Sequence, residues 1–160
     1  MNDFNLFINK YKDNHLEDKE IIKILNYYSK ISTNDDNYET YFEKYFQICE
    51  KTISIEEYLK RLIMHLDISK NLIVVSSIYI NRLKIKFNYN YFHKIILISL
   101  LVTNKFLEDD NMNNKFWADC GGIPLHLLNK LEKKFLIKIN YNLYIGEEEF
   151  CKKYYEIFSD

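Results

Sequence analysis

The stretch that most restricts how this chain can fold runs from His93 to Leu107, HKIILISLLVTNKFL. Between Ile95 and Val102 every residue except Ser99 is apolar, so almost every face of the stretch requires burial. A helix that is apolar all round is enclosed by other helices, whereas a surface helix has one apolar stripe. The stretch is also shorter than the roughly 18 apolar residues that a bilayer-spanning helix needs. We therefore predict a central helix inside an all-α domain.

The last turn of this predicted helix differs from the rest because a charged side chain stands beside an aromatic one. Lys105 precedes Phe106, and the acidic residues Glu108, Asp109 and Asp110 follow. A cation that reaches the surface among apolar side chains suggests a docking face for another protein. The three acidic residues also fit a solvated loop.

Few glycines and prolines favour helices over tight hairpins in the rest of the chain. There are 3 Gly and 1 Pro among 160 residues, which is the size of one domain. The formal net charge is −1, from 22 Lys and Arg and 23 Asp and Glu. A nucleic-acid or anionic-membrane partner requires a basic face, so this balance argues against both.

Cys49, Cys120 and Cys151 are odd in number and widely spaced, which indicates free thiols in a reducing compartment rather than disulfides or a zinc site. The histidines share no ligand spacing, and His93 is expected to form a hydrogen bond at the start of its helix. No nucleophile stands in a pattern with a base. The N-terminus lacks a basic start followed by a long apolar run, so we expect no secretory signal. A cytoplasmic and/or nuclear, non-catalytic protein without cofactor, metal or small-molecule substrate is expected.

Apolar residues at helical spacing predict further helices on both sides of the central one. Residues 38–51 fit either a helix or an irregular aromatic segment draped over the core. No strand is predicted. The other expected helices lie over residues 3–12, 18–31, 54–66, about 71–86, a short segment around 116–120, about 124–140 and 147–158.

Capping residues mark several of these helix ends. Ser54 and Glu57 form an S-x-x-E capping box. Ser69 is the expected N-cap of the following helix. Gly121 and Gly122 stand where a short helix should end, because glycine readily takes the left-handed conformation that terminates a helix.

Six segments, read together and in order, carry a resemblance to a known family: ISIEEYLKRL (53–62), IYINRL (78–83), FHKIILISLLVTNKFLEDD (92–110), NNKFWADCGGI (113–123), LNKLEKKFL (128–136) and YNLYIGEEEF (141–150). These segments resemble a cyclin, most closely the P-type (phosphate-system) cyclins. They cover about residues 53–158. The resemblance implies one five-helix cyclin box at 53–145, with an N-terminal helical extension at 1–52 and a C-terminal helix at 146–160. It also implies a regulatory subunit that binds and activates a cyclin-dependent protein kinase.

The resemblance also implies which residues meet the kinase. The interface lysine of the family corresponds to Lys105 and its glutamate partner to Glu132. These two groups flank an apolar pocket that receives a side chain of the kinase C-helix. One of the acidic residues 108–110 is a candidate partner for an Arg of the kinase activation segment. The implied pocket residues are Val102, Phe106, Leu136, Tyr141 and Leu143.

The sequence departs from the family pattern at Asn81, where an Asp usually faces the first-helix arginine, here Arg61. A neutral amide compensates a buried guanidinium less well than a carboxylate does, so a weaker contact is expected. A substrate-docking groove on the first helix is not predicted.

Other interpretations of the sequence stay open at this point. Lys105 and Glu132 also fit an ordinary surface ion pair, and the chain also fits a cyclin-fold scaffold or helical adaptor that acts on no kinase.

Overall fold

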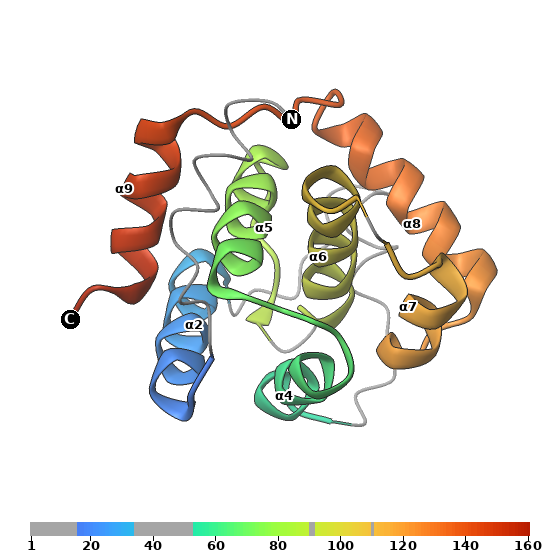
Figure 1. Ribbon diagram of the computed structural model, residues 1–160, viewed down its shortest axis with the longest axis horizontal. Coiled ribbons are helices and arrows are strands. Elements are labelled where there is room, and N and C mark those ends of the chain that lie inside the picture. The colour runs from blue at the N-terminus through green and yellow to red at the C-terminus, as the bar shows by residue number, and fades with distance from the viewer. Residues whose placement is uncertain (1–15, 34–52, 90–91, 110) are drawn as a thin grey trace.

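The computed structural model describes residues 16–33, 53–89, 92–109 and 111–160. Within these ranges the protein is all-α, and its single isolated backbone bridge joins Thr33 to Asn88. Figure 1 shows the arrangement of the helices. They are α2 (Asp18–Ile31), α4 (Ile55–His65), α5 (Lys70–Arg82), α6 (His93–Leu107), α7 (Asn114–Gly121), α8 (Leu125–Lys138) and α9 (Glu147–Phe158).

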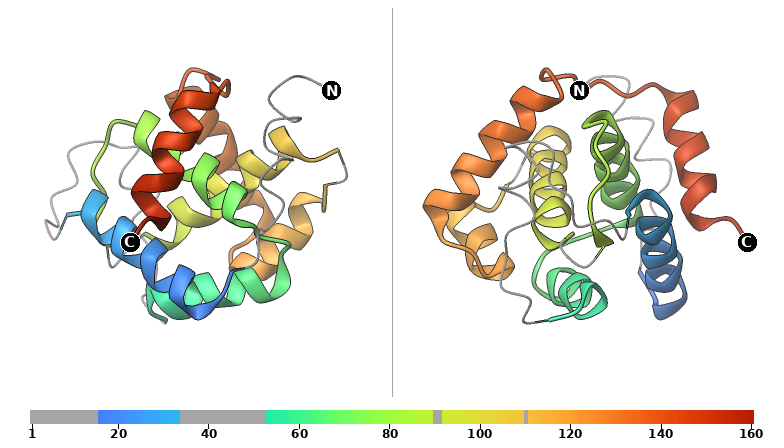
Figure 2. Two further views of the ribbon diagram at one scale, coloured as in Figure 1. Left: turned by 60° about the vertical axis from the view of Figure 1, so that its left-hand side comes forward. Right: turned by 180° about the vertical axis from the view of Figure 1, so that it is seen from behind.

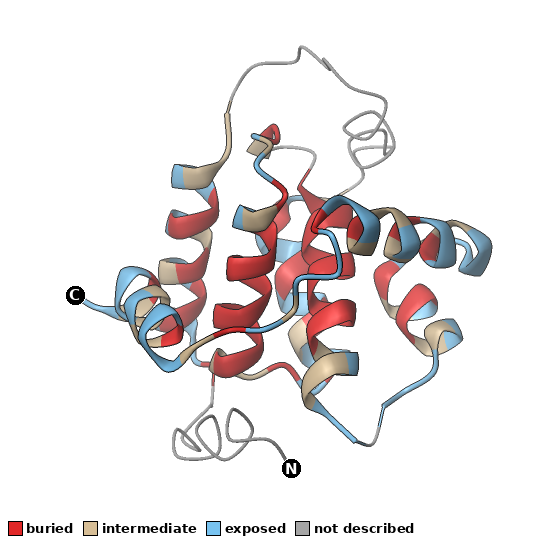
Figure 3. Ribbon diagram, turned by 90° about the horizontal axis from the view of Figure 1, so that it is seen from above, coloured by how far each residue is buried: buried red, intermediate tan, exposed pale blue. Residues whose placement is uncertain are grey.

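The helix α6 lies at the centre and has the bounds that the sequence predicts. Every residue from His93 to Thr103 is buried, including Lys94 and Ser99. The helices α4, α5, α7 and α8 pack around it, and Figure 3 shows the resulting buried interior. The prediction of a central, enclosed helix in an all-α domain is therefore confirmed.

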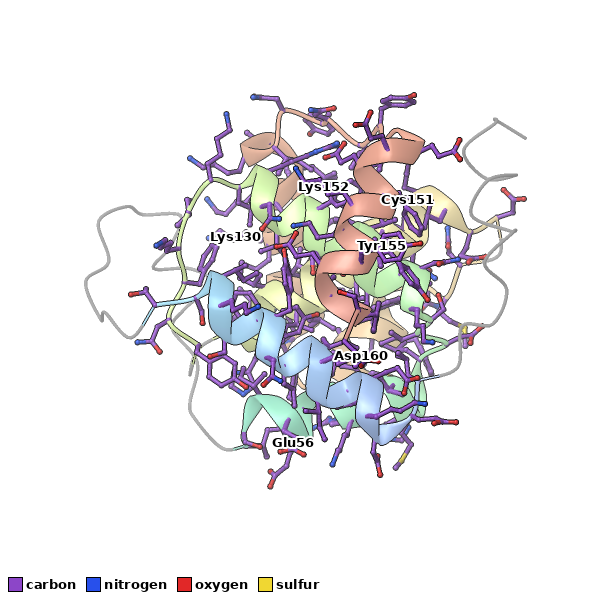
Figure 4. All side chains as sticks on the ribbon, turned by 90° about the vertical axis from the view of Figure 1, so that its left-hand side faces the viewer. Glu56, Lys130, Cys151, Lys152, Tyr155 and Asp160 are labelled. Carbon is purple, nitrogen blue, oxygen red and sulfur yellow. The ribbon has the colours of Figure 1, made fainter. Side chains whose placement is uncertain are left out.

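Six of the seven described helices form three layers, which are clearest in the view from behind in Figure 2, and α4 lies across one end of these layers. The middle layer holds α5 and α6; α8 and α7 lie on one side of it, and α9 and α2 on the other. The five helices α4 to α8 fall within residues 53–145. The C-terminal helix packs against both α5 and α2. On this face Lys23 Nζ lies 2.7 Å from the carboxylate of Asp160, which Figure 4 shows beside α2.

Local capping chemistry sets several helix ends as predicted. The Ser54 hydroxyl accepts the Glu57 N–H at the start of α4, and the Ser69 hydroxyl accepts the Leu72 N–H at the start of α5. Gly122 takes the left-handed conformation, with φ at 69°, directly after α7. His93 Nε2 lies 2.8 Å from the Ile53 carbonyl oxygen, so it forms the expected hydrogen bond at a helix start.

The predicted end of α5 near residue 86 is wrong, because the helix ends at Arg82. Lys84 has a φ of 57°, which turns the chain out of the helix. Beyond this turn the backbone pairs with the end of α2: Thr33 N–H donates to the Phe87 carbonyl and Tyr89 N–H donates to the Thr33 carbonyl. These long-range bonds compete with continuation of the helix. The predictions for residues 3–12 and 38–51 lie outside the described residues.

Candidate functional site

The structure brings Lys105 and Glu132 together, although 27 residues separate them in sequence. Lys105 projects from the last turn of α6, and Glu132 lies in the middle of α8. The ammonium nitrogen is 3.0 Å from Glu132 Oε1 and 2.8 Å from Oε2, so it spans both carboxylate oxygens. The side chain of Lys105 is 38% exposed and that of Glu132 is 15% exposed. The pair therefore lies at the surface with its carboxylate partly shielded from water.

A third helix contributes to this charged cluster. The Asn114 side-chain amide, in the first turn of α7, donates to Glu132 Oε1 at 3.3 Å and to the Asn129 side-chain oxygen at 2.7 Å. The Glu132 carboxylate is thus oriented from α6 and α7 at once. The sequence reasoning missed Asn114 and Asn129. The available signal was the placement of Asn129 one turn before Glu132 on the same helix face.

The five implied pocket residues differ in accessibility. Phe106, Leu136 and Leu143 are partly buried and pack against the hydrophobic core, so part of each side chain remains at the surface. Val102 is only 3% exposed and belongs to the core itself. Tyr141 is 60% exposed, directly beyond the C-terminal end of α8. Phe106 directly follows Lys105, and Leu136 lies one turn after Glu132 on α8, so these two partly exposed side chains form an apolar rim beside the ion pair, whereas Val102 is enclosed in the core.

The acidic residues after α6 lie at the surface. The Glu108 N–H donates to the Asn104 carbonyl and ends the helix, while its side chain is exposed. Asp109 is also exposed, and Asp110 is outside the described residues. Glu108 and Asp109 are therefore both accessible to a basic group on a partner.

Arg61 and Asn81, whose contact the sequence predicts to be weak, form their hydrogen bonds with different partners. Arg61 is exposed, and its Nη2 donates to the Asp119 carbonyl of α7 at 3.4 Å. The Asn81 side chain instead exchanges hydrogen bonds with the Tyr27 hydroxyl of α2. The two residues thus face different neighbouring helices, α7 and α2. A neutral amide has no charge with which to draw the guanidinium inward.

Arg82, the residue after Asn81, binds main-chain oxygens between α8 and α9, and sequence reasoning missed this contact. Arg82 is 16% exposed and donates to the carbonyl oxygens of Asn142 at 2.6 Å and Tyr144 at 2.7 Å. The Tyr79 hydroxyl, on the same face of α5, donates to the Leu143 carbonyl at 2.8 Å. Burial raises the pKa of Tyr79 well above its ordinary value, so the hydroxyl stays a donor even where an exposed tyrosine would begin to ionise.

Two other classes of site have no support in the described part of the chain. No group of three or more His, Cys, Asp or Glu side chains there could hold a metal ion. Within the same residues, no helix has both the length and the apolar character needed to cross a bilayer. Cys120 and Cys151 are free thiols, as predicted for those two residues.

Comparison with known proteins identifies the family. A family model described as Cyclin matches residues 8–143, which includes α2 as well as the helices from α4 to α8. Cyclin-U4-2 from Arabidopsis thaliana is 32% identical over 69% of this chain and 56% of its own length.

Two further relatives match the subgroup that the sequence resembles. The PHO85 cyclin-like protein psl1 from Schizosaccharomyces pombe is 31% identical over 61% of this chain and 43% of its own length. Cyclin-P4-1 from Oryza sativa subsp. japonica is 31% identical over 65% of this chain and 51% of its own length. The chain spans about half the length of the curated relatives it matches. The all-α fold around α6 and the family match over most of the chain show that it belongs to the cyclin family.

Proposed function

We propose that this chain is a regulatory subunit that binds and activates a cyclin-dependent protein kinase by docking the kinase C-helix. The observation that carries the proposal is the meeting of Lys105 and Glu132 at the surface, with Phe106 and Leu136 partly exposed on the same two helices. The relative psl1 is named as a PHO85 cyclin-like protein, and this likeness supports a kinase partner for the present chain. Catalysis would belong to the partner and not to this chain.

The geometry is suited to an exchange of partners on binding. In the free chain the ammonium of Lys105 and the carboxylate of Glu132 form an ion pair, although Glu132 Oε2 accepts no hydrogen bond from the described residues. Ion pairs at the protein surface contribute only about 0–1 kcal/mol. In a complex, the ammonium would donate hydrogen bonds to the kinase main chain, and the carboxylate would accept hydrogen bonds from it. Both groups would then be shielded from water. Hydrogen bonds to charged groups are worth about 1.5–3 kcal/mol each.

These magnitudes are sufficient for activation. Shifting a kinase from 1:99 to 99:1 in favour of its active state requires about 5.5 kcal/mol of differential binding. Two charged hydrogen bonds and one apolar side chain buried on the rim would supply a free energy of that order. In the active state the C-helix glutamate of a kinase pairs with the lysine that holds ATP.

The test is a titration of a kinase carrying a PSTAIRE-like C-helix with the wild-type chain and with a Lys105→Ala/Glu132→Ala variant. Losing one partner of a buried charged pair costs about 2–5 kcal/mol. The dissociation constant should therefore rise by at least about 30-fold, and activation of the kinase should fall in parallel.

A matched control is Glu56→Ala/Lys60→Ala on α4, which removes an exposed pair 3.0 Å apart and should leave binding unchanged. Equal binding and activation by the wild type and the Lys105→Ala/Glu132→Ala variant would contradict the proposed interface. Binding without activation would favour the alternative, a cyclin-fold scaffold.

A further inference from the structure

Three consecutive main-chain carbonyls between α8 and α9 accept hydrogen bonds from one face of α5. Arg82 binds the carbonyl oxygens of Asn142 and Tyr144, and Tyr79 binds that of Leu143 between them. Tyr79 and Arg82 are three residues apart and so share a helix face. The Arg82 guanidinium carbon also lies 5.8 Å from the centroid of the Tyr79 ring. We call these two side chains the α5 support.

The backbone just before this segment has a conformation that bulky residues rarely adopt. Asn140 and Tyr141 have φ values of 56° and 53°. Residues in this region persist where the surrounding structure fixes them from several sides. Tyr141 N–H donates to the Leu136 carbonyl at 2.8 Å, so the segment is held by the end of α8 on one side and by the α5 support on the other.

The same segment leaves large side chains at the surface. Tyr141 is 60% exposed, Tyr144 is 73% exposed, and Ile137 in the last turn of α8 is 53% exposed. The backbone is therefore fixed while the aromatic rings remain accessible. Aromatic side chains are enriched at protein interfaces, and a backbone that is already ordered reduces the entropy lost on binding.

The α5 support also reaches the C-terminal helix. Arg82 Nη2 lies 3.2 and 3.0 Å from the two carboxylate oxygens of Glu149, in the first turn of α9. One guanidinium thus contacts the connection and the helix that follows it. The Arg82 side chain is 16% exposed and that of Glu149 is 47% exposed, so solvent screens this ion pair from the side of Glu149.

We propose that Tyr79 and Arg82 are positioning residues that hold the segment around Tyr141 and Leu143 in its partner-binding conformation. The ion pair with Glu149 makes the order of this segment depend on the docking of α9. The inference rests on the proposed function, because it takes Tyr141 and Leu143 as part of the kinase-binding surface. Neither Tyr79 nor Arg82 needs to touch the partner.

The variants that test this inference are Arg82→Gln, Arg82→Lys and Tyr79→Phe in the full chain. Tyr58→Phe is the matched control, since it removes a buried hydroxyl that donates to the Gly121 carbonyl at 2.7 Å in a different part of the fold. Tyr79→Phe removes a single oxygen atom, so it keeps the test available if Arg82→Gln does not fold.

The first measurement is amide hydrogen exchange in the free chain, read at Tyr141 and Asn142. Exchange at these amides should rise at least tenfold in Arg82→Gln and Tyr79→Phe, be partly restored in Arg82→Lys, and stay unchanged in Tyr58→Phe. Glu149→Gln should give a smaller rise at the same amides. Unchanged exchange in both Arg82→Gln and Tyr79→Phe would overturn the inference.

The second measurement is activation of the kinase as a function of the concentration of the chain. For Arg82→Gln the half-saturating concentration should rise about tenfold while the maximal rate is kept, because the support only orders the surface. A half-saturating concentration equal to that of the wild type, despite faster exchange, would overturn the inference. A wild-type chain that fails to activate the kinase contradicts the proposed function instead, and exchange then still decides whether the support orders the segment.

Discussion

Replacing Gly121 with alanine should destabilise the protein through one specific collision with the central helix. An added methyl carbon would lie 2.3 Å from Leu97 Cδ2 and 2.8 Å from Cδ1. Carbon atoms in contact are normally about 3.5–4.0 Å apart, so the Leu97 side chain would have to move by more than about 1 Å. Leu97 is fully buried in α6, and a close-packed interior offers little room for this shift.

The size of the effect follows from two opposing contributions. Overpacking a core costs about 1–3 kcal/mol. Alanine has a helix propensity about 1 kcal/mol better than glycine, and Gly121 is the last residue of α7, so part of that difference is recovered. We expect a net loss of about 1–2 kcal/mol in the free energy of unfolding, measured by urea denaturation. For a chain of this size the melting temperature should fall by about 2–8 °C.

A double-mutant cycle with Leu97→Ala identifies the cause. Leu97→Ala alone should cost about 2–5 kcal/mol, and the added methyl group should then fill part of its cavity. The combined loss should be smaller than the sum by about 1 kcal/mol or more. Gly122→Ala is the control, because its φ of 69° imposes a backbone cost while its nearest side chain, Arg61, is at an ordinary 3.6 Å. Additive losses for Gly121 and Leu97, or a neutral Gly121→Ala, would refute the reasoning.

Three further predictions concern stability. Tyr28→Phe should raise the free energy of unfolding by about 1 kcal/mol in urea denaturation, since the buried Tyr28 hydroxyl has no hydrogen-bond partner among the described residues; a loss of stability would show that the hydroxyl is satisfied. Burial, with a smaller contribution from Tyr27, raises the pKa of Tyr28 in the folded state. Ionisation of this residue therefore leaves the free energy of unfolding of the wild type unchanged below about pH 10 and lowers it as the pH rises from there through the folded-state pKa. Melting temperatures measured from pH 8 upward should therefore fall less steeply in Tyr28→Phe than in the wild type, and parallel curves would contradict this. Ser69→Ala should cost about 1 kcal/mol in urea denaturation by removing the N-cap of α5, and no change would show that water replaces the hydroxyl.

The sequence was most informative where structure depends on neighbouring residues. The bounds of α6 follow from its own apolar run, and the hydroxyls of Ser54 and Ser69 cap the helices that directly follow them. The left-handed residue after α7 is likewise a local property of Gly122. Such features involve only a few residues along the chain, so patterns predict them.

Features that depend on contacts between distant segments were predicted poorly. The end of α5 at Arg82 reflects pairing with Thr33, far away in sequence. Arg82 itself was overlooked because its acceptors lie 60 residues or more away and are main-chain oxygens, which carry no sequence signature. For the candidate site, the closeness of Lys105 and Glu132 came from family resemblance and not from their spacing, whereas Asn114 had no motif to reveal it.

The α5 support has a consequence for how this surface can diversify. Its hydrogen bonds to residues 142–144 are made to peptide oxygens, which every amino acid supplies. Replacing the side chains of Asn142 or Tyr144 therefore leaves those acceptors in place. If the α5 support holds the loop as proposed, a library that varies these two positions should yield many folded variants, because the shape of the loop is then encoded on another helix.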